Sequence, residues 1–274
     1  MLVLARRWEV ETGQTLDGVL QVGDMGAFPD TDRLDRATRK HAAADPDELG
    51  YSAYLRGCPE GQVLLGGAGW PVLWVRGNHE DFDHLAQFEV PTAVDPWGRL
   101  CFVPDGTTAT VAGLRVGAMG GMPRPGVPRG RRQRARAALR ETTPPERPDW
   151  IVPRQAATAY PDGGLDILLS HAGPAGLTRG GSRFLSDMVE RVRPRVHLFG
   201  HHHLRLGPVS DPGGTVTIGL DHLGFVSERL QSGCWGILAL DEDGVQWTWG
   251  EDVPWCHQVR RSGYRSWIAA LQAS

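Results

Sequence analysis

Three consecutive histidines, at positions 201–203, are the group of residues in this sequence best suited to chemistry. They follow an apolar run at residues 196–199 that is typical of a buried strand, and Gly200 marks the end of that strand. In extended backbone His201 and His203 lie on one side of the chain and His202 on the other. Imidazole is the commonest protein ligand for transition metals, so this pair indicates a metal site. A polar loop is the alternative; a terminal tag does not fit, because about 70 residues follow.

Three further apolar runs end in the same manner, each with a side chain behind it that can bind a metal or move a proton. The runs at residues 18–22, 71–76 and 166–169 are followed by Asp24, by Asn78 and His79, and by His171. Ligands of open α/β sheets bind outside the carboxyl ends of the strands, so we expect these side chains to converge with the histidine pair. Each strand end alone is more often a turn than a ligand. Together, the carboxylate, the carboxamide and the imidazoles can fill the coordination shell of a transition metal.

The composition is that of an ordinary globular protein, and we expect a single domain over residues 1–274. The chain is 41% hydrophobic and 22% charged, with a net charge of -3, so no general basic character points to nucleic acid. The sequence contains no apolar run near 18 residues, and its first residues lack the order of a signal peptide. The four cysteines are scattered with no Cys-x-x-Cys pair, which favours a reducing compartment. We therefore expect a cytoplasmic protein with no membrane partner.

Further elements can be placed by periodicity and by breakers. Apolar residues with helical spacing predict helices over residues 1–12 and 184–192, and strands are expected at 100–103 and 109–118. The polar stretch at 27–66 is interpreted as an excursion from the core. The stretch at 120–155 is rich in Arg, Pro and Gly and is interpreted as a loop. Residues 214–250 are predicted to form a C-terminal β-meander.

These motifs resemble those of the calcineurin-like metallophosphoesterase superfamily. The matching segments are Gly23-Asp24, Gly77-Asn78-His79-Glu80, Ser170-His171 and Gly200-His201-His202-His203. The resemblance implies an α/β fold, a four-layer α/β/β/α sandwich, with two metals at the sheet edge. It also implies that the metals are divalent transition ions, manganese first, with iron, zinc or nickel as alternatives.

The resemblance further implies a role for each matching residue. Asp24 would bridge both metals, and Asn78, His171 and His201 would complete one site. His203 would belong to the other site, and His202 is assigned to neither metal. Asn78 and His79 would contact the substrate, and His79 would bind the phosphoryl oxygen or protonate the leaving group. Two metals can clamp a phosphoryl group and lower the pKa of a water between them, which fits phosphoester hydrolysis.

One motif of the family is missing. The family opens with a strand that ends in Asp-x-His, but only 22 residues precede Gly23 and they contain no histidine. Either the start of translation was placed too late, which we favour, or the shorter chain is real. As given, the fold would lack its first strand, and the second metal site would keep only Asp24 and His203. We expect the chain to bind one metal well and to turn over phosphoesters poorly or not at all.

The substrate is less well defined by the sequence. The Asp-Arg-Gly of protein Ser/Thr phosphatases is replaced by residues 25–29, and there is a looser similarity to RNA lariat debranching enzymes in the long excursion, in residues 77–80 and in residues 113–121. Seven arginines between 124 and 140 could hold a nucleic-acid backbone, although a solvated loop is the favoured interpretation. Our first hypothesis is a phosphodiesterase acting on a phosphoester substrate, with nucleotides or nucleic acid as candidates. The alternative is a catalytically silent member that keeps one metal site as a scaffold. No protein partner is indicated.

Overall fold

Two β-sheets form the centre of the molecule in the computed structural model, which describes residues 1–44, 49–123, 147–151, 158–161 and 164–273. The first sheet has the order β1-β2-β4-β3, built from β1 (Val19–Gln21), β2 (Val72–Trp74), β4 (Leu100–Phe102) and β3 (Thr92–Ala93). The second has the order β5-β6-β7-β8-β10-β9, built from β5 (Thr108–Val111), β6 (Leu114–Met119), β7 (Ile167–Ser170), β8 (Val196–Phe199), β10 (Val216–Gly219) and β9 (Leu206–Ser210). Strands β1, β2 and β4 run parallel, and so do β6, β7, β8 and β10.

The sheets pack face to face because successive residues of their strands point to opposite faces, and the residues on both faces are apolar. In β2, Leu73 points into the core between the two sheets, whereas Val72 and Trp74 point to the opposite face. In β7, Leu169 faces the same central core and Leu168 faces outward. Strands that are buried on both faces in this way need a covering layer on each side.

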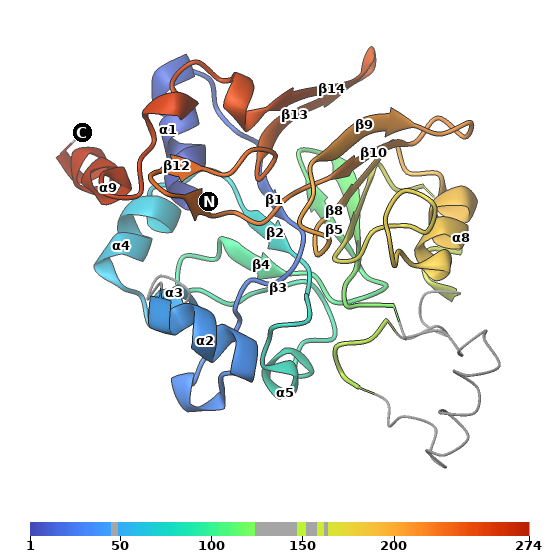
Figure 1. Cartoon of the computed structure of the whole chain (residues 1–274), viewed down its shortest axis with the longest axis horizontal. Coiled ribbons are helices and arrows are strands. Elements are labelled where there is room, and N and C mark those ends of the chain that lie inside the picture. The colour runs from blue at the N-terminus through green and yellow to red at the C-terminus, as the bar shows by residue number, and fades with distance from the viewer. Residues whose placement is uncertain (45–48, 124–146, 152–157, 162–163, 274) are drawn as a thin grey trace.

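Helices supply both covering layers (Figure 1). The helices α1 (Leu2–Thr12), α3 (Gly50–Leu55) and η3 (Gln62–Gly66) cover the outer face of the first sheet. Helix α8 (Arg183–Val192) covers the outer face of the second sheet. The elements α2 (Arg36–Ala44), α4 (Pro59–Gly61), α5 (Phe82–Leu85) and η1 (Thr31–Arg33) lie on the side of the first sheet. This arrangement confirms the predicted four-layer α/β/β/α sandwich.

Both predicted helices are present, and the first buries an arginine. Helix α1 ends at Gly13, whose φ of 67° is left-handed, and α8 is capped by the Ser182 hydroxyl. Arg7 lies off the apolar stripe of α1, yet its guanidinium is buried over the rings of Trp255 and Trp267, with centroid distances of 4.7 and 3.5 Å. The aromatic partners lie about 250 residues away, and helical spacing gives no sign of them.

The interpretation of residues 27–66 as an excursion from the core is wrong. Ala27, Tyr51 and Leu65 from this stretch are buried in one cluster with Trp70 and Trp74 of the first sheet. The apolar residues are widely spaced along short helical pieces, so the segment looks polar in sequence even though it covers a sheet face.

The predicted β-meander over 214–250 is also wrong in part. Strand β10 pairs in parallel with β8 and antiparallel with β9, which the sequence did not indicate. Strands β13 (Gly236–Asp241) and β14 (Gly244–Trp249) do form the expected hairpin, and β11 (Phe225–Val226) and β12 (Arg229–Leu230) form another. The chain closes with η4 (Gly250–Asp252), η5 (Cys256–Gln258) and α9 (Tyr264–Ala273).

Two expectations concern residues outside the described ranges. The arginine run at 124–140 lies wholly outside them. The predicted loop at 120–155 lies partly outside them, and its described ends are joined by hydrogen bonds between Met122 and residues 149 and 151. Within the described chain, β1 is hydrogen-bonded to β2 alone, so a further strand beyond β1 stays a prediction. No described helix is long and apolar enough to span a bilayer. That the chain forms a single domain also stays a prediction.

Candidate metal centre

The ends of four strands bring four predicted metal ligands together. Strands β1 and β2 deliver Asp24 and Asn78, and strands β7 and β8 deliver His171 and His201. The Nε2 atom of His171 lies 2.9 Å from Asn78 Oδ1 and 3.5 Å from Asp24 Oδ2. The rings of His171 and His201 have centroids 4.9 Å apart. The two sheets therefore contribute two candidate ligands each at their shared edge, with His171 in contact with the other three.

The hydrogen bonds of His171 leave its Nε2 atom with a lone pair aimed at oxygen. Its Nδ1 atom lies 2.9 Å from the carbonyl oxygen of Val22, which can only accept, so Nδ1 carries the proton. Burial lowers the pKa of His171, so the ring is neutral and Nε2 is unprotonated. A bare nitrogen facing Asn78 Oδ1 and Asp24 Oδ2 has no proton to share. A divalent cation between these three atoms satisfies all of them, so the residues fit a transition metal.

The other two side chains that can bind the metal through a charge or an imidazole, His201 and Asp24, are also in a form that can bind it. Burial lowers the pKa of His201 to about 4, so this imidazole too is neutral and free to bind. The Oδ1 atom of Asp24 accepts hydrogen bonds from the backbone N–H groups of Asn78 and His79, at 2.7 and 3.0 Å. The bonds fix the carboxylate and leave Oδ2 on the side of His171.

Backbone geometry at the strand ends is unusual and tightly packed. Asp24, His201 and His203 have φ angles of 55°, 62° and 48°, in the left-handed region that non-glycine residues rarely adopt. A Cβ atom on Gly23 would lie 2.4 Å from His171 Nδ1, and one on Gly77 would lie 2.0 Å from Asp24 Oδ1. Only glycine allows the two loops to approach the ligands so closely.

Comparison with known proteins agrees with this geometry. The family model for calcineurin-like phosphoesterases matches residues 15–205, which is more than half of the chain. The chain belongs to this family. No curated protein matches the sequence.

Two solved structures give weaker likenesses. One is 13% identical and covers 90% of this chain and 93% of its own, with a TM-score of 0.46. The other is the Termus thermophilus sulfate thiohydrolase SoxB in complex with glycerol. It is 16% identical, the match covers 92% of this chain and 46% of the SoxB chain, and the TM-score is 0.35. Both scores are too low to carry an argument, so the family assignment rests on the family model.

Glu80 is a residue of this candidate site whose role the sequence did not reveal. Its carboxylate accepts hydrogen bonds from the backbone N–H groups of Met25, Ala27 and Gly77, at 2.9, 2.6 and 3.1 Å. Burial raises the pKa of Glu80 to about 8, and the charge of Asp24 adds to this, while the three N–H donors oppose it. The side chain thus ties the loop after β1 to the loop after β2 and positions both metal-binding loops.

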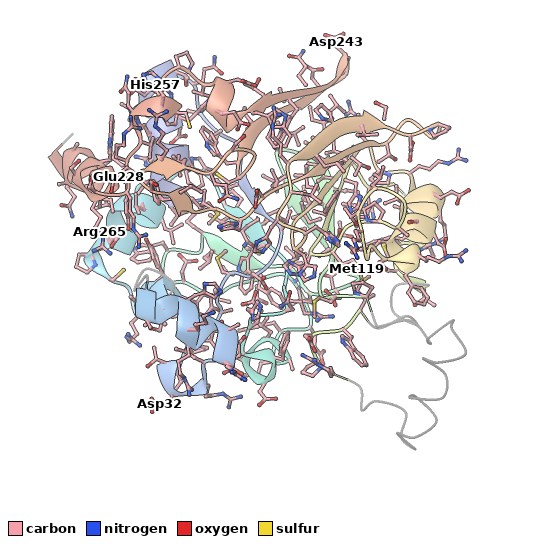
Figure 2. All side chains as sticks on the ribbon, viewed as in Figure 1. Asp32, Met119, Glu228, Asp243, His257 and Arg265 are labelled. Carbon is pink, nitrogen blue, oxygen red and sulfur yellow. The ribbon has the colours of Figure 1, made fainter. Side chains whose placement is uncertain are left out.

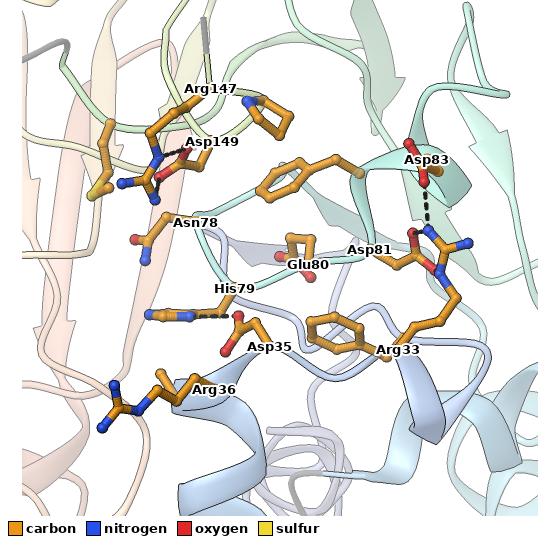
Figure 3. A pocket seen from close by; sticks show the side chains of 15 residues that line it. Arg33, Asp35, Arg36, Asn78, His79, Glu80, Asp81, Asp83, Arg147 and Asp149 are labelled. Carbon is orange, nitrogen blue, oxygen red and sulfur yellow. Dashed lines mark hydrogen bonds and ion pairs between the residues drawn. The ribbon is translucent and has the colours of Figure 1, made fainter. Parts of the chain in front are cut away.

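His79, the predicted acid, is oriented by a partner from the supposed excursion. Its Nδ1 atom lies 2.8 Å from Asp35 Oδ2, while Asp35 Oδ1 accepts from the N–H of Thr38 and caps helix α2 (Figure 3). Burial opposes ionisation of Asp35, but the bonds from Thr38 and His79 outweigh it and lower the pKa of Asp35. No hydrogen bond to a described residue occupies the other ring nitrogen of His79. Sequence reasoning missed Asp35, which lies 44 residues before His79.

The two remaining histidines of the triplet have different surroundings. The Nε2 atom of His202 accepts a hydrogen bond from the N–H of Gly173 at 2.9 Å, so this ring holds the loop after β7. His203 faces His222, with ring centroids 4.8 Å apart, rather than the four clustered ligands. The structure therefore brings Asp24, Asn78, His171 and His201 together and leaves His203 beside them with other neighbours.

A cleft of about 510 Å³ opens in front of Asn78 and His79 (Figure 3). Two of its three arginines are engaged, since Arg33 pairs with Asp81 and Asp83, and Arg147 pairs with Asp149. Arg36 lines the same cleft at the start of α2, and no hydrogen bond or ion pair ties it to another described residue. This guanidinium is the cleft's candidate contact for an anionic substrate.

Proposed function

We propose that this chain is a metal-dependent phosphodiesterase. The observation that carries the proposal is the aim of His171 Nε2 at Asn78 Oδ1 and Asp24 Oδ2, beside a cleft that contains His79. Asp24, Asn78, His171 and His201 would hold a divalent metal, with Mn²⁺ as our first candidate. When bound, the metal would polarise the phosphoryl group and make water a better nucleophile.

The chain's own groups have separate tasks in this reaction. Arg36 neutralises the charge of the substrate and Asn78 holds it near the metal ligands. His79 gives a proton to the leaving oxygen, and Asp35 keeps the imidazole in the orientation for that transfer. Glu80 acts through the backbone of the two ligand loops and touches neither the metal nor the substrate.

The charge of the cleft favours a diester over a monoester. Its described lining contains three arginines and four aspartates, besides Glu80, whose pKa burial raises to about 8; they are Arg33, Arg36, Arg147, Asp35, Asp81, Asp83 and Asp149. A diester carries one negative charge near neutral pH, whereas a monoester approaches two. A single uncommitted arginine beside several carboxylates matches the smaller charge. A nucleotide diester is therefore the substrate class we would test first.

The test is hydrolysis of bis-p-nitrophenyl phosphate, with p-nitrophenyl phosphate as the monoester comparison. We expect activity that requires added Mn²⁺ and that favours the diester. His79→Ala should lower kcat by about 100-fold or more, the range of general acid catalysis, while His257→Ala, an exposed histidine elsewhere, should change nothing.

The silent-scaffold alternative makes the opposite prediction for the same assay. A chain that binds Mn²⁺ at the four ligands, and hydrolyses neither ester above the rate of the His79→Ala variant, would contradict the proposal. It would favour a family member that keeps its metal site for structure or binding.

A further inference from the structure

The carboxyl end of β10 lies beside the histidine triplet and carries its own metal-capable residues. Strands β8 and β10 are parallel, with Gly219 opposite Phe199, and the N–H of Leu220 donates to the carbonyl oxygen of Phe199 at 2.8 Å. Asp221 and His222 therefore leave β10 at the same edge at which His203 follows β8.

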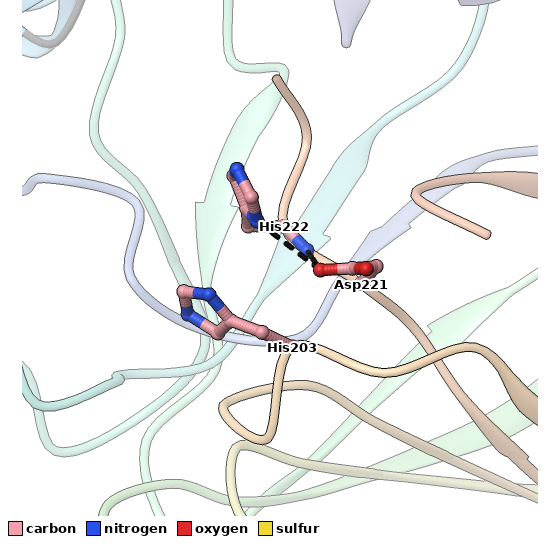
Figure 4. Close-up of side chains that lie close together, drawn as sticks. All are labelled: His203, Asp221 and His222. Atoms are coloured by element: carbon pink, nitrogen blue, oxygen red, sulfur yellow. Dashed lines mark hydrogen bonds and ion pairs between the residues drawn. The ribbon is translucent and has the colours of Figure 1, made fainter. Parts of the chain in front are cut away.

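Three side chains meet at this point. His203, Asp221 and His222 each offer one ligand atom, and these atoms all lie within 4.8 Å of one another (Figure 4). The two imidazole rings are tilted by 33°. Ligands about 2.1 Å from one ion lie about 3.4–4.2 Å apart, so shifts of about 1 Å in these exposed side chains would close the site.

Hydrogen bonds already hold the acidic member and one imidazole in position. Asp221 Oδ2 accepts from the Gln231 side chain at 2.7 Å, and the N–H of Asp221 donates to the carbonyl oxygen of Gly233 at 2.9 Å. Asp221 Oδ1 lies 3.1 Å from His222 Nδ1, so a cation that binds both atoms would replace the proton that they share.

We propose that His203, Asp221 and His222 form a second divalent-cation site next to the four-ligand centre. Two imidazoles and one carboxylate suit Zn²⁺ or Mn²⁺. His203 and His222 are exposed, so water competes for the ion and the second site binds more weakly than the less exposed first one. The proposal does not depend on turnover, because it concerns binding alone.

Metal titration of the whole chain tests this site without an activity assay. Zn²⁺ binding is followed by isothermal titration calorimetry, and Co²⁺ binding by visible absorbance, for the wild-type chain and for His222→Ala, Asp221→Asn and Asn78→Ala. The His222 side chain is 50% exposed, so its removal should leave the fold intact, and circular dichroism checks this. His257→Ala is the matched control, because His257 lies at the end of the molecule where α1 is found (Figure 2).

We expect two ions per wild-type chain, one tight and one weaker. His222→Ala and Asp221→Asn should weaken only the second ion, by about tenfold or more, and Asn78→Ala should weaken only the first. A second ion whose affinity is unchanged in both variants overturns the proposal, and so does a single ion that His222→Ala leaves in place. A single ion that His222→Ala removes and Asn78→Ala does not would support this site while contradicting the four-ligand centre of the proposed function.

Discussion

Asp35→Asn separates two tasks that one carboxylate performs. Asp35 caps helix α2 through Oδ1 and orients His79 through Oδ2. Asparagine caps helices as well as aspartate does, so the substitution keeps the cap and removes only the charge beside the imidazole. We expect the fold and the metal affinity to stay unchanged, with the free energy of unfolding within about 0.5 kcal/mol of wild type.

The size of the catalytic effect follows from the exposure of the pair. Two charges about 4 Å apart interact by about 4 kcal/mol near a protein surface. His79 and Asp35 are 39% and 34% exposed, so solvent screens this to about 1–2 kcal/mol. If the loss of the carboxylate costs the proton-donating form of His79 that amount, kcat falls by about 5- to 30-fold.

The assay compares diesters with good and poor leaving groups. If His79 protonates the leaving oxygen, Asp35→Asn should slow a phenyl diester more than bis-p-nitrophenyl phosphate, because p-nitrophenolate leaves without help. Asp30→Asn is the control, since Asp30 is exposed and caps the neighbouring turn η1. A kcat for Asp35→Asn within twofold of the Asp30→Asn value, with both substrates, would refute the role assigned to Asp35.

Three other substitutions probe the support of the site. Glu80→Ala leaves three N–H groups of the ligand loops without their acceptor, so the free energy of unfolding in urea should fall by at least about 3 kcal/mol. Gly23→Ala drives a methyl group into His171 Nδ1, so Mn²⁺ affinity should fall by about tenfold or more. His197 is fully buried, and burial lowers its pKa to about 3, below the ordinary 6.5. The folded state therefore binds fewer protons than the unfolded state, stability is lost as pH falls from 6.5 toward 3, and His197→Gln should flatten that loss.

Each of these changes has a matched control in the chain. Glu89→Ala removes an exposed carboxylate and should be nearly neutral, and a similar loss in both Glu variants would contradict the role of Glu80. Gly13→Ala adds a methyl group at a left-handed residue with nothing within 4 Å, so it should spare metal affinity. Equal metal loss in both Gly variants would show that backbone strain, rather than the clash with the ligand, is responsible. His257→Gln should keep the wild-type acid slope, and a wild-type slope in His197→Gln would be inconsistent with the buried neutral ring.

The sequence predicted the layers and the four clustered ligands because both depend on local pattern. Apolar runs identify strands that are buried on both faces, and parallel strands must place the residues after their carboxyl ends at one edge. Asp24, Asn78, His171 and His201 all obey that rule, and the structure places them together.

The contacts that the sequence missed depend on tertiary packing. Asp35 reaches His79 only because the segment at 27–66 folds back over the sheet edge, and Glu80 binds backbone groups, which have no sequence signature. Asp221 and His222 follow an apolar strand as the other ligands do. They were overlooked because residues 214–250 were interpreted as a meander, which would have placed that strand end elsewhere.

Anomalous diffraction from a crystal soaked in Mn²⁺ would show directly whether the four strand ends form one metal centre. We predict a peak about 2.0–2.3 Å from Asp24 Oδ2, His171 Nε2 and a nitrogen of His201, with Asn78 Oδ1 turned toward it. The absence of a peak there, with His171 Nε2 still in contact with Asn78 Oδ1, would contradict the metal centre.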